Sequence, residues 1–128
     1  MKKLFVSVPM KGRTEEEIKA SIQKMKKIAE IYEGEELELI DSYIDEEPTE
    51  NCNRGVWFLA KSIDMLAEAD VFIGIQECYD WKGCLIENGV AEKYDIKRYS
   101  VRADYVIDDY ASVYRKAHPE CVNACFQG

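Results

Sequence analysis

The chain has 128 residues, a length that suits one compact domain with a single core. Its apolar share of 47% and charged share of 33% are typical of a soluble globular protein, and no window holds the roughly 20 consecutive apolar residues of a membrane-spanning helix. The net charge of −8 argues against a partner that is polymeric nucleic acid, because neutralising phosphates requires a basic face, but it allows a small nucleoside or nucleotide ligand. Five cysteines without a regular framework favour a reducing, cytoplasmic setting.

Short apolar runs alternate along the chain with segments of helical periodicity. In chain order we expect a strand at 4–8, a helix between 14 and 34, a strand at 37–40, a long acidic loop at 41–53, a helix at about 54–68, a strand at 71–75, a helix at 83–94, a strand at 98–101, a short fifth strand at 105–107 and a final helix from 108 or 109 to 117. Thr14 and Glu17 have the spacing of a capping box, and Gly34 is placed to end the first helix. Strands that alternate with helices predict a small doubly wound α/β fold, with a parallel sheet of four to five strands covered on both faces. We expect one domain over 1–128, with 102–128 as a C-terminal extension.

The stretch 69–91, A-D-V-F-I-G-I-Q-E-C-Y-D-W-K-G-C-L-I-E-N-G-V-A, joins a buried strand to a helix whose first turn is expected to carry Glu87. Ligands of open α/β sheets bind outside the carboxyl ends of the strands, so Glu87 is expected to point into that crevice. There a carboxylate can act as a nucleophile at a glycosyl centre, and the helix amino end would keep it ionised. The alternative, left equally open, is that Glu87 only complements the helix dipole.

Three further features of the sequence have two interpretations each. The loop 9–13, with Lys11, Gly12 and Arg13, predicts an anion site at a helix amino end, or else a tight turn with solvated basic residues. Trp81 either stacks on a base or packs over the strand ends. Gly83 and Gly89 would let a ligand approach the backbone, although helix packing also accounts for Gly89.

Metal and thiol chemistry are not expected. The pattern His118-x-x-Cys121-x-x-x-Cys125 supplies three ligands at a spacing unlike that of known zinc sites, so we expect neither a metal nor a cofactor. Cys84 lies near a helix amino end, but no histidine is close in sequence, and we interpret it as structural.

The segments V-P-M-K-G-R, W-F-L-A-K-S-I-D-M-L-A-E-A-D and G-C-L-I-E-N-G-V-A resemble the nucleoside 2-deoxyribosyltransferase-like proteins, in particular a small bacterial and phage branch of unknown function. Gly83, Glu87, Gly89 and Ala91 match the family's glycine followed by E-x-G-x-A. The resemblance, which spans roughly residues 4–99, implies a flavodoxin-like sheet, a homo-oligomer, and cleavage or transfer at an N-glycosidic bond. Glu87 would then be the nucleophile, with the loop 9–13 bordering the sugar or phosphate.

Two positions depart from the family pattern. Ser62 stands where the enzymes usually carry an aspartate in the middle helix, and Asp64 two residues on would face elsewhere. Trp81 stands where a second aspartate is usual, with Asp80 displaced by one. The candidate catalytic residues are therefore Glu87, Asp80 and Ser62, and the candidate ligand-binding residues are Pro9, Met10, Lys11, Gly12, Arg13, Asp64, Trp81, Gly83 and Gly89.

The expected function is hydrolysis or transfer at the N-glycosidic bond of a nucleoside or nucleoside 5′-monophosphate. One alternative is a module that binds a nucleotide or an ADP-ribose-like signal without turnover, and another is a structural oligomer component with a vestigial pocket. Sites in this family are often completed by a neighbouring subunit's carboxyl-terminal segment, for which Tyr110, Tyr114 and Asn123 are candidates.

Overall fold

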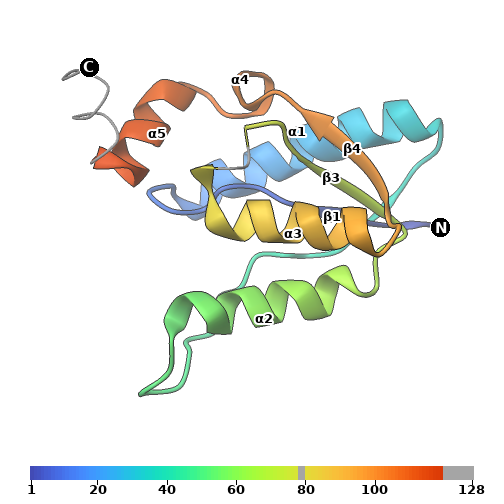
Figure 1. Cartoon of the computed structure of the whole chain (residues 1–128). Helices are drawn as coiled ribbons and strands as arrows, with labels where there is room; N and C mark the ends of the chain where they lie inside the picture. Colours follow the sequence, from blue (N-terminus) through green and yellow to red (C-terminus); the bar gives the residue numbers. More distant parts are fainter. Residues whose placement is uncertain (78–79, 120–128) are drawn as a thin grey trace.

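The computed structural model describes residues 1–77 and 80–119 and shows strands alternating with helices (Figure 1). The elements are β1 (Lys3–Val6), α1 (Glu15–Glu33), β2 (Glu38–Leu39), α2 (Arg54–Leu66), β3 (Val71–Ile75), α3 (Lys82–Lys93), β4 (Lys97–Val101), α4 (Ala103–Val106) and α5 (Tyr110–Ala117). The four strands form one parallel sheet in the order β2-β1-β3-β4. The predicted doubly wound α/β class is confirmed, and the arrangement is consistent with a flavodoxin-like fold.

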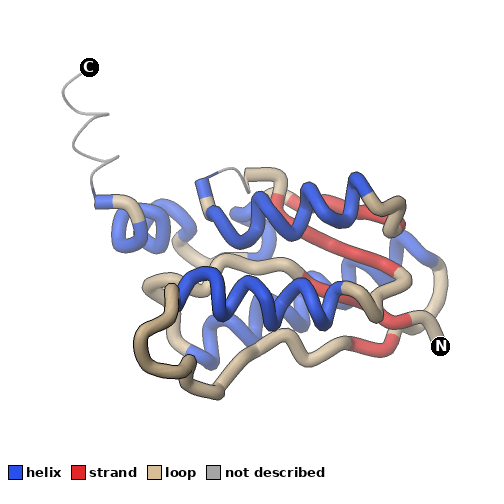
Figure 2. Tube along the Cα trace, turned by 60° about the horizontal axis from the view of Figure 1, so that its bottom comes forward, coloured by secondary structure: helices blue, strands red, loops and turns tan. Residues whose placement is uncertain are grey.

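Helices cover both faces of this sheet (Figure 2). On one face, Ile22 and Met25 of α1 share a core with Val6 and Ile73 of the two central strands. The intervening side chains of the same strands point to the opposite face, as the period of a strand requires. There the rings of Phe5 and Phe72 stack with centroids 6.0 Å apart and pack with Leu66 of α2 and Ala91 of α3.

The ends of α1 follow from local sequence. The Thr14 side chain accepts a hydrogen bond from the Glu17 amide at 3.2 Å, which satisfies one of the unpaired N–H groups of the first turn. At the other end Gly34 adopts the left-handed conformation (φ 75°) and donates its N–H to the Glu30 carbonyl at 2.8 Å. Both predicted boundaries are confirmed.

Helix α2 is attached to the rest of the protein mainly through its carboxyl-terminal end. Leu66 is fully buried, whereas Phe58, Leu59 and Ile63 are only half-buried and Val56 near the amino end is 61% exposed. Figure 1 shows the amino-terminal turns of α2 extending away from the sheet. The predicted apolar face of α2 therefore exists, but little of it is covered.

The predicted fifth strand at 105–107 is wrong. Residues Ala103–Val106 form the short helix α4, in which Ala103 and Val106 are both buried. The carbonyl of Val106 accepts a hydrogen bond from the Ser21 hydroxyl of α1 at 2.7 Å. This contact between distant residues fixes a conformation that the apolar run alone does not specify.

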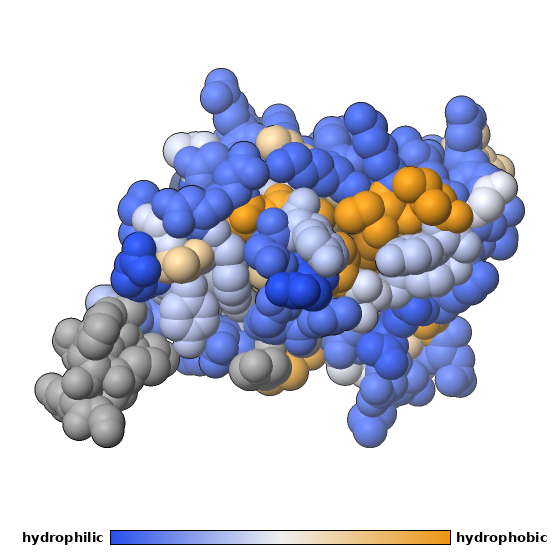
Figure 3. Space-filling model, turned by 90° about the horizontal axis from the view of Figure 1, so that it is seen from above, coloured by the Kyte–Doolittle hydropathy of each residue, from blue (hydrophilic) through white to orange (hydrophobic). Residues whose placement is uncertain are grey.

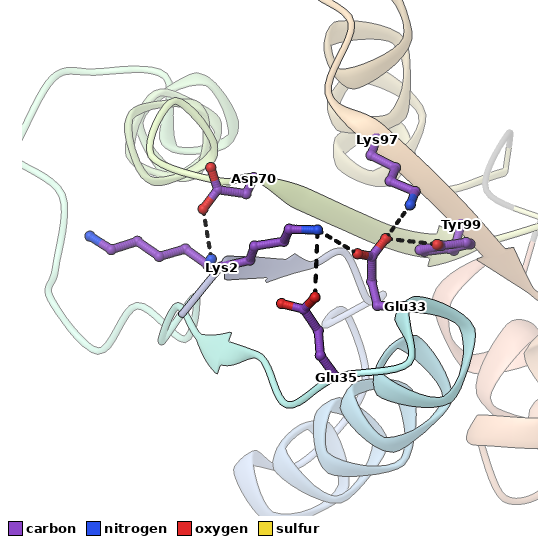
Figure 4. A network of polar contacts seen from close by, with 7 residues as sticks. Lys2, Glu33, Glu35, Asp70, Lys97 and Tyr99 are labelled. Carbon is purple, nitrogen blue, oxygen red and sulfur yellow. Dashed lines mark hydrogen bonds and ion pairs between the residues drawn. The ribbon is translucent and has the colours of Figure 1, made fainter.

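A polar network ties the end of α1 to the amino-terminal edge of the sheet (Figure 4). The Glu33 carboxylate accepts hydrogen bonds from Lys2 Nζ at 3.0 Å and from the Tyr99 hydroxyl at 2.7 Å, and it pairs with Lys97 Nζ at 2.6 Å. These donors lower the pKa of Glu33 to about 2. Nearby, Asp70 accepts the backbone N–H of Lys3 at 2.8 Å. The network lies at the edge opposite to the carboxyl ends of the strands, so its role is to hold the fold.

The face of the molecule seen from above, over β4 and α4, is largely hydrophilic with one hydrophobic area near its middle (Figure 3). On α1, Ile31 is 77% exposed and Tyr32 stacks on Tyr99 of β4. Within the described residues no helix is long and apolar enough to cross a membrane.

Candidate functional site

The strand order places the topological switch point between β1 and β3, because the chain leaves β1 toward β2 on one side and leaves β3 toward β4 on the other. The side chain of Glu87, from α3, lies at this edge. Its Oε1 atom accepts a hydrogen bond of 2.6 Å from the hydroxyl of Ser7, the residue directly after β1. This contact places the Glu87 carboxyl at the carboxyl ends of the central strands, but the side chain is only 8% exposed, whereas the sequence predicts one that points into an open crevice.

The sequence predicts Glu87 in the first turn of its helix, and this prediction is wrong. The helix begins at Lys82, so Glu87 falls in the second turn, and the first turn holds no acidic residue. The helix dipole acts mainly within the first turn. Complementing the dipole therefore does not explain this carboxylate.

The pKa of Glu87 is shifted in the direction opposite to the one predicted from the helix end. Glu87 is only 8% exposed, and this burial raises the pKa of its carboxyl because charge is poorly solvated in the interior. Hydrogen bonds from the hydroxyls of Ser7 and Ser62 act in the opposite direction and are the smaller effect. Burial, which sequence spacing does not reveal, sets the direction of the shift.

The structure brings together Glu87 and Ser62, two of the three predicted catalytic residues. Ser62 comes from the half-buried inner side of α2, and its hydroxyl hydrogen-bonds to the Glu87 carboxyl. The third, Asp80, is half-buried just before α3 and is not among the groups that shift the pKa of Glu87. Sequence reasoning missed Ser7, although one signal was present: a hydroxyl that interrupts the apolar run of the first strand.

The Arg13 guanidinium is held by hydrogen bonds to its own loop and to α1. It donates to the carbonyls of Pro9 and Glu17 at 3.0 and 3.1 Å and to the Ser21 hydroxyl at 2.5 Å. These three acceptors tie the loop to α1. The Arg13 side chain is half-buried, so it is not a solvated surface charge. These contacts, four to eight residues along the chain, exclude a solvated basic side chain, and the anion site at this loop stays a prediction.

The rest of the loop 9–13 is consistent with a tight turn. Gly12 has a φ of +76°, a conformation that favours glycine. Pro9 is buried, Met10 is half-buried with its carbonyl accepting the Arg13 N–H at 3.2 Å, and Lys11 is exposed. Lys11 is therefore the cation of this loop that faces solvent.

Trp81 packs over the strand ends, one of its two predicted roles. Its side chain is 5% exposed, its Nε1 donates to the Tyr110 hydroxyl at 3.2 Å, and its ring meets the His118 ring edge-on at 4.8 Å. Tyr114 also contacts His118, with ring centroids 4.7 Å apart. In this structure α5 thus packs on its own chain, which gives Tyr110 and Tyr114 contacts within the chain.

The two glycines beside Glu87 are not required by packing. A Cβ atom added at Gly83 or at Gly89 would meet no atom within 4 Å, so helix packing does not account for Gly89. Asp64, two residues after Ser62, is exposed, and Cys84 is buried in the core. Gly83 lies one turn before Glu87 on the same side of α3, whereas Gly89, two residues after Glu87, faces away from it.

Two surface hollows lie on the α1 side of the molecule. One, of about 270 Å³, is lined by residues that include Gln23, Asp41 and Ser42, and the other, of about 320 Å³, by residues that include Arg13 and Lys24. Neither includes Glu87. Among residues 1–77 and 80–119 no group of three histidine, cysteine or acidic side chains is placed to hold a metal ion, and Cys121, Asn123 and Cys125 lie outside the described residues.

Comparisons with models of protein families, with curated proteins and with solved structures found no match for this chain. The resemblance to the nucleoside 2-deoxyribosyltransferase-like family therefore stays a prediction from the quoted sequence motifs.

Proposed function

We propose that this protein hydrolyses or transfers the glycosyl group at the N-glycosidic bond of a nucleoside or nucleoside 5′-monophosphate, with Glu87 as the nucleophile. The observation that supports this proposal is the 2.6 Å hydrogen bond that holds the Glu87 carboxyl against the end of β1, at the switch point of the sheet. Ligands of open α/β sheets bind at this place. The open space beside Gly83, one turn before Glu87, leaves room next to this part of α3.

In the proposed reaction a carboxylate oxygen of Glu87 forms a bond to the anomeric carbon while the bond from that carbon to the base breaks. The base leaves with the electron pair and takes a proton from water. Water, or a hydroxyl of an acceptor, then releases the sugar from Glu87. Because Ser62 is a poor acid, departure of the base lacks the carboxylic acid that an aspartate would supply, and we expect slow turnover.

The test is to incubate the protein with a panel of nucleosides and 5′-monophosphates and to separate any released base by chromatography. Glu87→Gln should abolish release. Glu92→Gln, an exposed residue on the same helix, is the matched control and should leave release unchanged. Release that persists in Glu87→Gln removes this residue from the mechanism.

A second candidate function is capture of a nucleotide or ADP-ribose-like signal without turnover. The burial of Glu87 favours it, because a raised pKa lowers the fraction of the carboxyl that is ionised at a given pH, and an 8% exposed side chain offers little surface to a substrate. Thermal unfolding across a nucleotide panel separates the two functions. Stabilisation without product supports capture, whereas product formation supports catalysis.

The proposal includes a small-molecule partner, a cytoplasmic location and a homo-oligomer. Exposed apolar side chains on adjoining helices are typical of contact surfaces: Val56 of α2 is 61% exposed, and Leu85 and Ile86 of α3 are each 44% exposed. Light scattering on the purified protein tests the oligomer, and a monomer at micromolar concentration would refute it.

A further inference from the structure

We infer that Ser7 is a positioning residue for the proposed reaction, and that its hydroxyl holds the Glu87 carboxyl in place for attack. The inference rests on the proposed function of Glu87. Ser7 itself is 2% exposed, too deeply buried to touch a substrate, so it acts through Glu87.

The geometry separates Ser7 from an ordinary buried serine. Its hydroxyl donates to Glu87 Oε1 at 2.6 Å, whereas the equally buried Ser42 donates to the Val6 carbonyl at 3.4 Å. Ser7 is also fixed by its backbone, because its N–H donates to the Ile73 carbonyl of β3 at 2.9 Å. A donor on a rigid strand end leaves the carboxyl little freedom to rotate, and a short bond to a carboxylate is among the stronger hydrogen bonds.

The groups that hydrogen-bond to the Glu87 carboxyl are neutral. Ser7 reaches it from the end of β1 and Ser62 from α2, while Cys84 lies about one turn earlier on α3. No charged side chain contributes to the shifted pKa of Glu87 among the described residues. Removing the Ser7 hydroxyl therefore removes a force that favours the ionised form and leaves the Ser62 hydroxyl to oppose the effect of burial.

The experiment compares Ser7→Ala with Ser42→Ala as a matched control of equal burial, and with Ser7→Thr, which keeps a hydroxyl. Two measurements are made on each variant: base release as a function of pH, and the titration of the Glu87 side-chain carboxyl by ¹³C NMR. The Glu87 resonance is assigned as the one that Glu87→Gln lacks. Ser7→Cys, with similar volume and a weak donor, replaces Ser7→Ala if circular dichroism shows that the alanine variant does not fold.

We expect Ser7→Ala to move the acid limb of the pH–rate profile upward and to lower base release about tenfold on that limb, the size expected for losing a hydrogen bond to a charged group. The Glu87 titration should move in the same direction. Ser7→Thr should restore both, and Ser42→Ala should change neither. A merely structural serine would lower the amount of folded protein without moving either titration.

The inference is overturned if Ser7→Ala keeps the wild-type acid limb and the wild-type Glu87 titration. The proposed function fails separately, if no nucleoside or 5′-monophosphate releases base with the wild-type protein. In that case the NMR titration alone still decides whether Ser7 holds the Glu87 carboxyl.

Discussion

Glu87→Gln is expected to stabilise the protein at neutral pH, even though the same change should abolish activity. The side chain is 8% exposed, and burial raises the pKa of its carboxyl above the ordinary value of 4.5. A group whose pKa is raised by folding contributes its full stability below the pKa of the unfolded chain, and that stability is lost as pH rises through the folded pKa. Glutamine keeps the shape and never ionises, so it avoids this loss.

The magnitude follows from the same linkage. Each unit by which folding raises the pKa costs the ionised form about 1.4 kcal/mol of folding free energy at high pH. A domain of this size is stable by roughly 5–15 kcal/mol, so one unit is a sizeable share of the total. The amide oxygen of glutamine can still accept the Ser7 hydroxyl, which limits the cost of the replacement.

The assay is urea unfolding of wild type and Glu87→Gln, followed by circular dichroism between about pH 3.5 and pH 8. The difference in unfolding free energy should be small at the acid end and should grow in favour of glutamine as pH rises. A variant that is less stable than wild type at pH 7, or a difference that does not change with pH, would refute the conclusion that burial dominates the pKa of Glu87.

Three further predictions concern the fold around the site. Glu33→Gln should destabilise the protein at pH 7, because folding lowers the pKa of Glu33 to about 2. In urea titrations the difference in unfolding free energy from wild type should shrink from about pH 4.5 downward, and a constant difference would contradict the ion-pair network. Fully buried Leu66 should lose about 2–5 kcal/mol of unfolding free energy on change to alanine, measured in urea. Val56→Ala, at an exposed position of the same helix, should change the unfolding free energy by about 0.5 kcal/mol or less. Equal effects would show that Leu66 does not anchor α2. Gly89→Ala should raise the melting temperature, with a gain of about 0.5–1 kcal/mol, because a Cβ there meets no neighbour; a loss of stability would reveal a packing role for this glycine.

The features that sequence predicted correctly depend on neighbouring residues. Thr14 and Gly34 bound α1 through hydrogen bonds to residues three or four positions away, so their spacing in the sequence is sufficient evidence. The strand β3 was predicted with its observed bounds, because a fully buried central strand is a continuous apolar run.

The errors involve contacts between residues that are far apart in the chain. Val106 belongs to a helix and not to a strand, and its carbonyl is bonded to Ser21, 85 positions away. The pKa of Glu87 depends on burial by surrounding elements and on Ser7, 80 positions away. No local pattern encodes these distances.

The convergence of Ser7, Ser62 and Glu87 is the strongest physical reason to regard this edge of the sheet as functional. Ser7 interrupts the apolar run of β1 and its continuation, Ser62 lies on the half-buried side of α2, and Glu87 is buried on α3. Burying a polar group costs free energy that its hydrogen bonds only partly return, and burying a carboxyl costs more. Apolar side chains at all three positions would pack the same interface without this cost. If stability alone mattered, replacing the three residues together would stabilise the fold. The test is the triple variant Ser7→Ala, Ser62→Ala, Glu87→Leu. A triple variant that is more stable than wild type but inactive would show that these residues serve activity at the expense of stability. A triple variant that unfolds more easily than wild type would instead show that the three polar residues hold the fold.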